Sequence, residues 1–379
     1  MHLRRLLPLL SLFLLAVPAR AQEAAPAPAA GGLLPVNDNT APPYFAVYRW
    51  GQGGVGKGLY DAYGPWLNRK VMWAEDFMPS ESWDKVEGQE WQLGTWKGWV
   101  QKQAGRRLVL SVPLLVGPWD GKGPKAGPGA GVAVSLAEGA KGTYNVYFQH
   151  LAENLVKQHL GDTILRLGWE FNGGWYQWRA QKEPEALNFA AYFKQIVTTM
   201  RAVPGAENLK FCWNPAMEPW WPYSPEKAWP GDDVVDYVGV DVYDQSWQKE
   251  TYPFPEGADA ATLAARQQKT WETTTNSLGK MGLPYWKKFA ADHGKPLAIP
   301  EWGVCQRQDK HGGMDNAYFI EQMFRFIHDP ANNVFFHCYF DVGAPDGDHQ
   351  LCPNPNNDKK TQFPLAAAKY VELFALPGQ

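Results

Sequence analysis

Short apolar stretches and longer amphipathic stretches alternate along most of this chain. Runs rich in Val, Leu, Ile and aromatic residues predict buried strands at 44–50, 71–74, 108–116, 163–170, 209–213, 236–243, 296–301 and 334–340. Stretches with a helical period separate most of these strands, at 82–103, 144–160, 184–203, 258–292, 315–327 and 364–374. Strands that alternate with helices in this way form a parallel sheet, and eight repeats close it. The pattern therefore predicts an α/β protein built as a single (β/α)8 TIM barrel.

Two of the predicted strands end alike, in a glutamate that is followed by an aromatic residue and, within three residues, by glycine. The fourth strand ends at Glu170 and the seventh ends at Glu301. Taken alone, Glu170 could be a structural carboxylate paired with Arg166, since ion pairs also occupy strand ends. Two such strand ends in one barrel favour a catalytic pair over a structural carboxylate, because the carboxyl ends of all the barrel strands meet at the same face. We expect both glutamates to face one cleft.

Two carboxyl groups across a cleft suit the hydrolysis of a glycosidic bond. One carboxyl group gives its proton to the leaving oxygen, and the other, ionised, attacks the anomeric carbon. We expect Glu170 to be the acid/base and Glu301 the nucleophile. In a strand, alternate residues share a face, so Arg166 lies on the side of Glu170 and deeper in the barrel, where its charge would keep a carboxylate ionised. Tyr243, at the end of the sixth strand, could donate a hydrogen bond to the nucleophile.

Aromatic residues are unusually abundant, with 19 Trp, 16 Tyr and 18 Phe. Indole rings beside polar residues favour a groove that stacks sugar rings, although many of these rings could equally be core. The candidate stacking residues are Trp175, Trp178, Trp213 and Trp302. Asn172 and Asp241 are candidates for hydrogen bonds to sugar hydroxyls, but Asp241 could instead be a structural residue inside the barrel.

Charge and motifs exclude several other classes of function. The 36 basic and 39 acidic residues nearly balance, which gives no indication of a nucleic-acid or membrane partner. No spacing typical of metal ligands occurs, so we expect no catalytic metal and no cofactor. The glycine-rich run at 51–58 resembles a phosphate-binding loop, but Gly58 stands where magnesium binding would require Ser or Thr. We expect that run to form a turn, and the protein to act as a monomer.

The N-terminal residues have the composition of a segment that directs export. Two arginines precede an apolar run at 6–17, and Ala19-Arg20-Ala21 supplies a cleavage site with small residues. These features predict a signal peptide over residues 1–21. The Ala- and Pro-rich stretch after it predicts a flexible linker over 22–42, which leaves 43–379 as the catalytic domain. We therefore expect a secreted or periplasmic protein.

Export would bring the four cysteines into an oxidising compartment. Cys305 and Cys352 follow the seventh and eighth strands, which are neighbours in a closed barrel, so we expect a disulfide bond between them. Cys212 and Cys338 fall within predicted strands and are expected to be buried thiols.

Several of these stretches together resemble glycoside hydrolase family 26. The run Arg166-x-x-x-Glu170-x-Asn-Gly-x-Trp-Tyr-x-Trp178 is similar to the family's acid/base motif. Residues 229–243 resemble its sixth-strand motif, residues 211–215 resemble its fifth strand, and Glu301-Trp-Gly stands at the place of its nucleophile. The resemblance implies a retaining endo-β-glycanase, typically a β-mannanase and sometimes a β-xylanase or mixed-linkage glucanase.

One position departs from the family pattern. The family usually has His directly before the acid/base, and this chain has Trp169. An indole cannot supply the ring-nitrogen hydrogen bond that a histidine offers to a sugar hydroxyl. We therefore expect weak activity on plain β-mannan and a preferred polymer that is a bacterial exopolysaccharide or another plant β-glycan. Whether the action is endo or exo stays open.

A protein of another class, a secreted carbohydrate-binding protein without turnover, is the alternative to an enzyme. The presence of Glu170, Glu301, Arg166 and Tyr243 together argues against it, because a binding protein would have no need for this set.

Overall fold

The computed structural model describes residues 32–117, 134–356 and 360–377. The predicted signal peptide and the linker as far as residue 31 lie outside the described residues. The description that follows concerns the compact unit Leu33–Gln379.

Eight parallel strands close into a barrel, as predicted. They are β1 (Tyr44–Tyr48), β2 (Trp73–Phe77), β3 (Arg107–Val112), β4 (Ile164–Leu167), β5 (Lys210–Trp213), β6 (Tyr237–Gly239), β8 (Leu297–Gly303) and β10 (Val334–Phe340). Each strand pairs with the next in this order, and β10 also pairs with β1, which closes the sheet. A short strand, β7 (Val242–Tyr243), follows β6 and pairs with the far end of β8.

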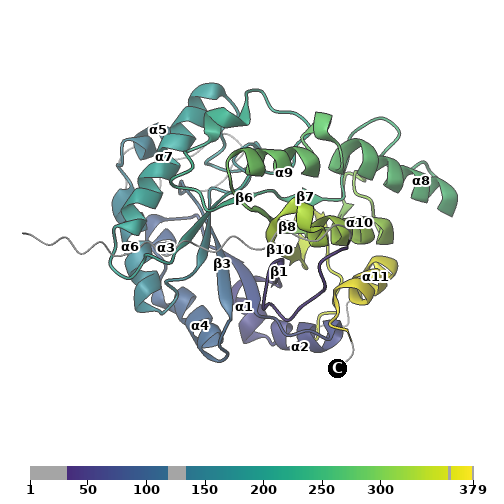
Figure 1. Ribbon diagram of the computed structural model, residues 1–379, viewed down its shortest axis with the longest axis horizontal. Helices are drawn as coiled ribbons and strands as arrows, with labels where there is room; N and C mark the ends of the chain where they lie inside the picture. The colour runs from purple at the N-terminus through teal and green to yellow at the C-terminus, as the bar shows by residue number, and fades with distance from the viewer. Residues whose placement is uncertain (1–31, 118–133, 357–359, 378–379) are drawn as a thin grey trace, which may run out of the picture. The chain divides into compact units, whose positions relative to one another are not determined.

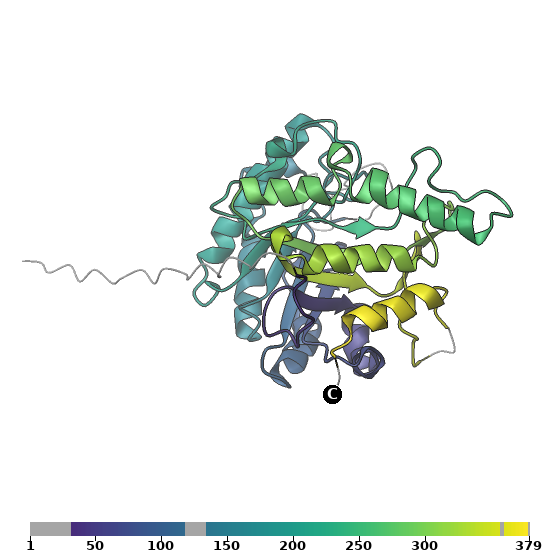
Figure 2. The ribbon, with the colours of Figure 1, turned by 45° about the vertical axis from the view of Figure 1, so that its right-hand side comes forward.

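Helices lie around the outside of the strands (Figure 1). They are α1 (Gly51–Gly56), α2 (Leu59–Leu67), α3 (Trp83–Val86), α4 (Glu90–Gln101), α5 (Leu136–Ala140), α6 (Asn145–Lys157), α7 (Glu183–Arg201), α8 (Ala260–Thr270), α9 (Leu283–Asp292), α10 (Ala317–His328) and α11 (Pro364–Phe374). Figure 2 shows α10 and α11 side by side against the strands. Within the described ranges, none of the helices combines the length and the apolar character needed to cross a membrane.

Some predicted elements differ from the observed ones. The glycine-rich run predicted as a turn begins with the helix α1. The helix predicted over 82–103 is divided into α3 and α4, because Gly88 between them has a φ of 76°, a left-handed conformation that breaks a helix. The helix predicted over 258–292 is likewise divided, into α8 and α9 with a π-helical turn (Trp271–Thr275) and a 3-10 turn (Leu278–Lys280) between them.

Two apolar layers hold the barrel together. Inside the barrel, small and aromatic side chains pack together, and the thiols of Cys212 and Cys338 are among them, buried as predicted. Outside it, a larger core fills the space between the strands and the helices and includes Trp213 and Trp302. Burying a large apolar side chain contributes about 1.5–3 kcal/mol, so this outer layer is a major source of stability.

The part of the predicted linker that the structure describes is held against the barrel. Leu34 N–H donates to the His328 carbonyl (2.6 Å), and the Asn39 amide bonds both backbone groups of Phe45 (2.7 and 2.9 Å). The guanidinium of Arg69 donates to the Asn37 carbonyl (2.6 Å). These hydrogen bonds attach the described part of the predicted linker to the barrel, and its flexibility stays a prediction.

The predicted disulfide bond between Cys305 and Cys352 is absent. All four cysteines are free and buried. A hydrogen bond joins the loops after β8 and β10 instead, because His349 Nδ1 lies 2.8 Å from the Val304 carbonyl oxygen. The Asp341 carboxylate also accepts the Cys352 N–H (3.2 Å), which fixes the second loop to the end of β10.

Candidate active site

A cleft of about 680 Å³ opens at the carboxyl ends of the barrel strands. Both predicted glutamates, Glu170 and Glu301, line it. The aromatic rings of Tyr48, Phe77 and Phe340, at or near the ends of β1, β2 and β10, form part of its wall. The barrel topology thus brings together residues from opposite parts of the sequence at one opening, as a barrel enzyme requires.

Both side-chain oxygens of Glu301 on β8 accept hydrogen bonds. Oε1 accepts from Arg166 Nη2 (2.8 Å), and Oε2 accepts from the Tyr243 hydroxyl (2.8 Å). The Glu301 backbone N–H donates to Asp241 Oδ1 (3.1 Å), which fixes the strand at this point. These contacts hold the Glu301 side chain in one fixed orientation, with a cation beside one oxygen and a hydroxyl beside the other.

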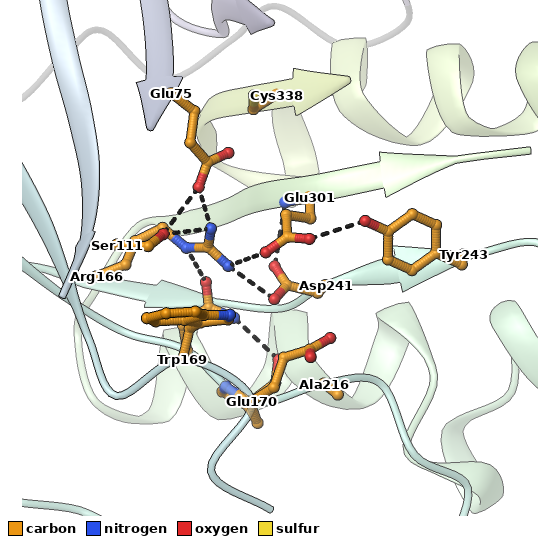
Figure 3. Close-up of polar contacts among 12 residues, drawn as sticks. Glu75, Ser111, Arg166, Trp169, Glu170, Ala216, Asp241, Tyr243, Glu301 and Cys338 are labelled. Atoms are coloured by element: carbon orange, nitrogen blue, oxygen red, sulfur yellow. Dashed lines mark hydrogen bonds and ion pairs between the residues drawn. The ribbon is translucent and has the colours of Figure 1, made fainter. Parts of the chain in front are cut away.

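Arg166 lies fully buried at the centre of these contacts (Figure 3). Its guanidinium lies between Glu75 on one side and Asp241 and Glu301 on the other. Burial alone would lower the pKa of Arg166, but the carboxylates around it outweigh burial and raise that pKa above its ordinary value. The side chain therefore remains a cation under the cleft floor.

Side chains from neighbouring strands complete the partners of Arg166. Ser111 Oγ on β3 and Asn214 Oδ1, just after β5, each accept one of its N–H groups at 2.8 Å. Gly239 on β6 leaves the room that Asn214 needs, because a Cβ at this glycine would lie 2.8 Å from Asn214 Oδ1. Burial raises the pKa of Glu75 to about 7, against the attraction of Arg166, so this carboxyl group is partly protonated at neutral pH.

Glu170 stands in a different environment. It follows β4 in a turn with a φ of 51°, and its N–H donates to the Asn214 carbonyl (2.7 Å). The Trp175 indole N–H donates to Glu170 Oε2 (2.7 Å). Burial, assisted by the charge of Glu301, raises the pKa of Glu170 to about 8. At neutral pH this carboxyl group carries a proton.

The pH dependence of any activity that needs protonated Glu170 follows from this pKa. Raising the pH through about 8 removes the proton, so kcat/KM should fall there. The Trp175 N–H stabilises the ionised form, so Trp175→Phe should raise the pKa of Glu170 and move the basic limb of the profile to higher pH. Trp220→Phe, at an indole 72% exposed and outside the cleft, is the control that should leave the limb in place. A limb that stays or moves down in Trp175→Phe would contradict the assignment.

The predicted site residues divide into two groups. Trp175 and Tyr243 line the cleft with the two glutamates, and Arg166 lies beneath it. Contrary to the prediction, three indoles lie in the core and cannot stack on a sugar: Trp178, Trp213 and Trp302. Their N–H groups are satisfied within the protein, by the carbonyls of Trp169 and Ala228 and by His337 Nδ1.

Asn172 and Asp241, the two candidates for hydrogen bonds to sugar hydroxyls, form hydrogen bonds within the protein instead. The Asn172 side chain forms two hydrogen bonds of 2.9 Å with the backbone of Ala216 and so joins the loops after β4 and β5. Asp241 is buried and bonds Arg166 Nη2 (2.8 Å) and the Glu301 N–H. This is the structural alternative that the sequence left open for Asp241.

Trp169, which departs from the family pattern, is buried and does not line the cleft. Its ring packs on Trp178 and Phe77, with ring centres 4.7 and 5.3 Å apart, and its N–H donates to the Tyr176 hydroxyl (2.9 Å). Tyr176 itself lines the cleft. Trp169 was also a candidate substrate-binding residue, and its burial outside the cleft contradicts that role, because its ring packs in the core and its N–H is already bonded.

Several residues of the site were not predicted. Glu75, Ser111 and Asn214 bond Arg166 from inside the barrel, and the inward positions of Glu75 and Ser111 in their strands could have predicted this. Glu218 and His349 line the cleft from loops, where no periodicity marks them. In the part of the chain that the structure describes, no three His, Cys, Asp or Glu side chains are grouped so as to hold a metal ion.

Comparison with known proteins adds two findings. Residues 135–262 match the model of glycosyl hydrolase family 26. A search of curated protein sequences finds no match. The matched segment contains Glu170 and Tyr243 but ends before Glu301.

Solved structures with the same barrel include two mannanases. An endo-beta-1,4-mannanase double mutant from Cellulomonas fimi superposes with a TM-score of 0.55 at 16% identity, covering 88% of this chain and 70% of that one. The catalytic domain of a family 26 endo-beta-1,4-mannanase from Bacillus sp. JAMB-750 superposes with a TM-score of 0.55 at 15% identity, and the match covers 87% of this chain and 85% of that one. The YdhT protein from Bacillus subtilis superposes with a TM-score of 0.53 at 13% identity, and the match covers 87% of this chain and 84% of that one. At these identities the superpositions establish a shared fold. The similarity to glycosyl hydrolase family 26 rests on the match over residues 135–262, which contains one of the two predicted catalytic glutamates.

Proposed function

We propose that this protein hydrolyses a β-linked polysaccharide with retention of configuration, with Glu301 as nucleophile and Glu170 as acid/base. The observation that carries the proposal is the contrast between the two carboxyl groups. Glu301 accepts hydrogen bonds from Arg166 and Tyr243, whereas burial raises the pKa of Glu170 to about 8. Carboxyl groups whose environments separate their protonation states are the pattern of acid and nucleophile pairs.

In the first step, a Glu301 oxygen attacks the anomeric carbon and forms an ester bond to the sugar. The bond from that carbon to the leaving oxygen breaks as Glu170 gives this oxygen its proton. In the second step, Glu170, now ionised, takes a proton from a water molecule, whose oxygen attacks the anomeric carbon and displaces Glu301. One water is consumed for each bond cleaved, and both carboxyl groups return to their starting states.

The Tyr243 hydroxyl orients the nucleophile in this scheme. Tyr243→Phe removes a hydrogen bond to a charged group, which contributes about 1.5–3 kcal/mol, so kcat should fall about 10- to 100-fold with the fold intact. Tyr192→Phe is a matched control, because the hydroxyl of this buried tyrosine donates to the Leu114 carbonyl (2.9 Å) outside the cleft. Steady-state kinetics of both variants test the role. Equal kcat values in Tyr243→Phe and the wild type would contradict it.

The polymer is proposed from the cleft and from Trp169. The starting expectation is a mannanase-like enzyme that cleaves β-mannan. Xylan, β-glucan and bacterial exopolysaccharides are alternative substrates for the same catalytic residues. Because the buried Trp169 offers the sugar no ring nitrogen, we expect weaker activity on unsubstituted β-1,4-mannan than the mannanases have. We also propose export from the cytoplasm, on the composition of residues 1–21.

A reducing-end assay on β-mannan, xylan, mixed-linkage β-glucan and bacterial exopolysaccharides tests the proposal. Wild type should release reducing ends from at least one polymer, and Glu301→Ala should release none at the same protein concentration. Binding of a polymer without any release would contradict the proposal and favour the carbohydrate-binding alternative. Vigorous hydrolysis of plain mannan would instead overturn only the expected substrate preference.

A further inference from the structure

His349 occupies a position in the cleft that the proposed chemistry does not use. It follows the short strand β12 (Gly347–Asp348) in the loop after β10, and it lines the cleft while only 2% of its surface is exposed. Its ring packs against Tyr243 and Phe340, with ring centres 4.7 and 5.6 Å apart. Tyr243 is the residue that bonds Glu301, so His349 lies on the nucleophile's side of the cleft.

The partner of one ring nitrogen determines what the other can do. His349 Nδ1 lies 2.8 Å from the Val304 carbonyl oxygen, which can only accept, so Nδ1 carries the proton. Burial lowers the pKa of His349, although Val304, Asp346, Asp348 and Glu301 oppose this, and the ring is neutral at neutral pH. In a neutral imidazole with Nδ1 protonated, Nε2 is a hydrogen-bond acceptor.

Nε2 makes no hydrogen bond to any residue in the described ranges. Nε2 is not one of the fully buried atoms without a partner, so it is accessible from the cleft that His349 lines, where a ligand or water can donate to it. Tyr243 and Phe340, which pack on the ring, restrict its rotation, and the Val304 bond fixes its plane. The acceptor is therefore held in one position at the wall of the cleft.

We propose that His349 Nε2 accepts a hydrogen bond from a hydroxyl group of the sugar that occupies the nucleophile's side of the cleft. This inference rests on the proposed function and adds to it a residue that selects the substrate. An acceptor of this kind recognises a free hydroxyl and rejects a sugar in which that position is absent, acylated or alkylated, because no proton is then available. The site therefore takes a sugar whose hydroxyl at the position facing His349 is free.

The test compares three variants on whichever polymer of the panel the wild type hydrolyses best. His349→Phe keeps an aromatic ring between Tyr243 and Phe340 but removes the acceptor, so kcat/KM should fall about 10- to 100-fold. His349→Gln, whose amide oxygen can accept, should recover part of that loss. His328→Phe is the matched control, because His328 is also buried with Nδ1 3.1 Å from a backbone carbonyl, but it lies on α10 outside the cleft.

The outcomes separate this inference from the function on which it rests. A loss in His349→Phe, partial recovery in His349→Gln and no loss in His328→Phe would support the inference. Wild-type kcat/KM in His349→Phe would overturn it and leave the proposed function intact. Equal losses in His349→Phe and His328→Phe, with equal falls in melting temperature, would also overturn it, since the effect would then be structural. A wild-type protein that hydrolyses no polymer would overturn the proposed function and this inference together.

Discussion

Glu301→Ala is expected to lower kcat by on the order of 10⁴-fold or more, which is the loss seen when a covalent nucleophile is removed from other hydrolases. The substitution should leave the fold intact, because alanine fits the strand. Arg166 retains its bond to Asp241, and the Tyr243 hydroxyl can reach water in the cleft. Steady-state kinetics on the best polymer measure the effect, and circular dichroism checks the fold. A Glu301→Ala variant with more than about a hundredth of wild-type kcat would contradict the role.

Glu170→Ala is the companion variant that distinguishes the two roles. It should retain activity on aryl glycosides with good leaving groups, because such groups need no proton from an acid. Added azide should rescue both variants but give different products. In Glu301→Ala, azide attacks from the nucleophile's face in one displacement and yields the inverted glycosyl azide. In Glu170→Ala, azide replaces water in the second displacement and yields the retained one. Identical azide products from the two variants would contradict the assignment.

Arg166→Met is expected to destabilise the protein by about 3–5 kcal/mol and to abolish activity. The substitution leaves Glu75, Asp241 and Glu301 close together and largely buried without their cation, and breaking a buried ion pair from one side carries a cost of this size. Urea unfolding measures the change in the free energy of unfolding. Arg201→Met is the matched control, because its pair with Asp236 (3.0 Å) is partly exposed and should contribute about 1 kcal/mol or less.

An Arg166→Met variant as stable as Arg201→Met would mean that the buried carboxyl groups do not depend on the guanidinium. In that case the orientation of Glu301 would have to come from Tyr243 and the strand alone. The two variants together therefore test whether one cation organises the floor of the cleft.

The alternation of residues along the strands accounts for much of what could be predicted. Arg166 and Glu301 point into the barrel, and their positions followed from strand ends and a period of two. The same rule places Trp302, next to Glu301, on the opposite face, and the structure has it in the outer core. Trp213, which stands between Cys212 and Asn214, follows the same rule. The prediction that these indoles stack on sugars failed because it weighed residue type above strand face.

Other features depend on contacts that no local pattern encodes. Glu170 lies beyond the end of β4, where Gly168 and Glu170 both have positive φ values, so a period of two no longer determines its direction. Barrel topology, and not periodicity, brought it to the cleft. Glu218 and His349 come from loops whose conformation depends on partners far along the chain. The free cysteines are a similar case, because hydrogen bonds join the loops for which a disulfide was predicted.

The most direct test of the central claim is the configuration of the first product. Proton NMR during the first minutes of hydrolysis by the wild-type protein distinguishes the anomers before they equilibrate in water. Two displacements by way of a Glu301 ester predict that the β-anomer accumulates first from a β-linked polymer. First accumulation of the α-anomer would mean a single displacement by water, and it would contradict the role of Glu301 as nucleophile.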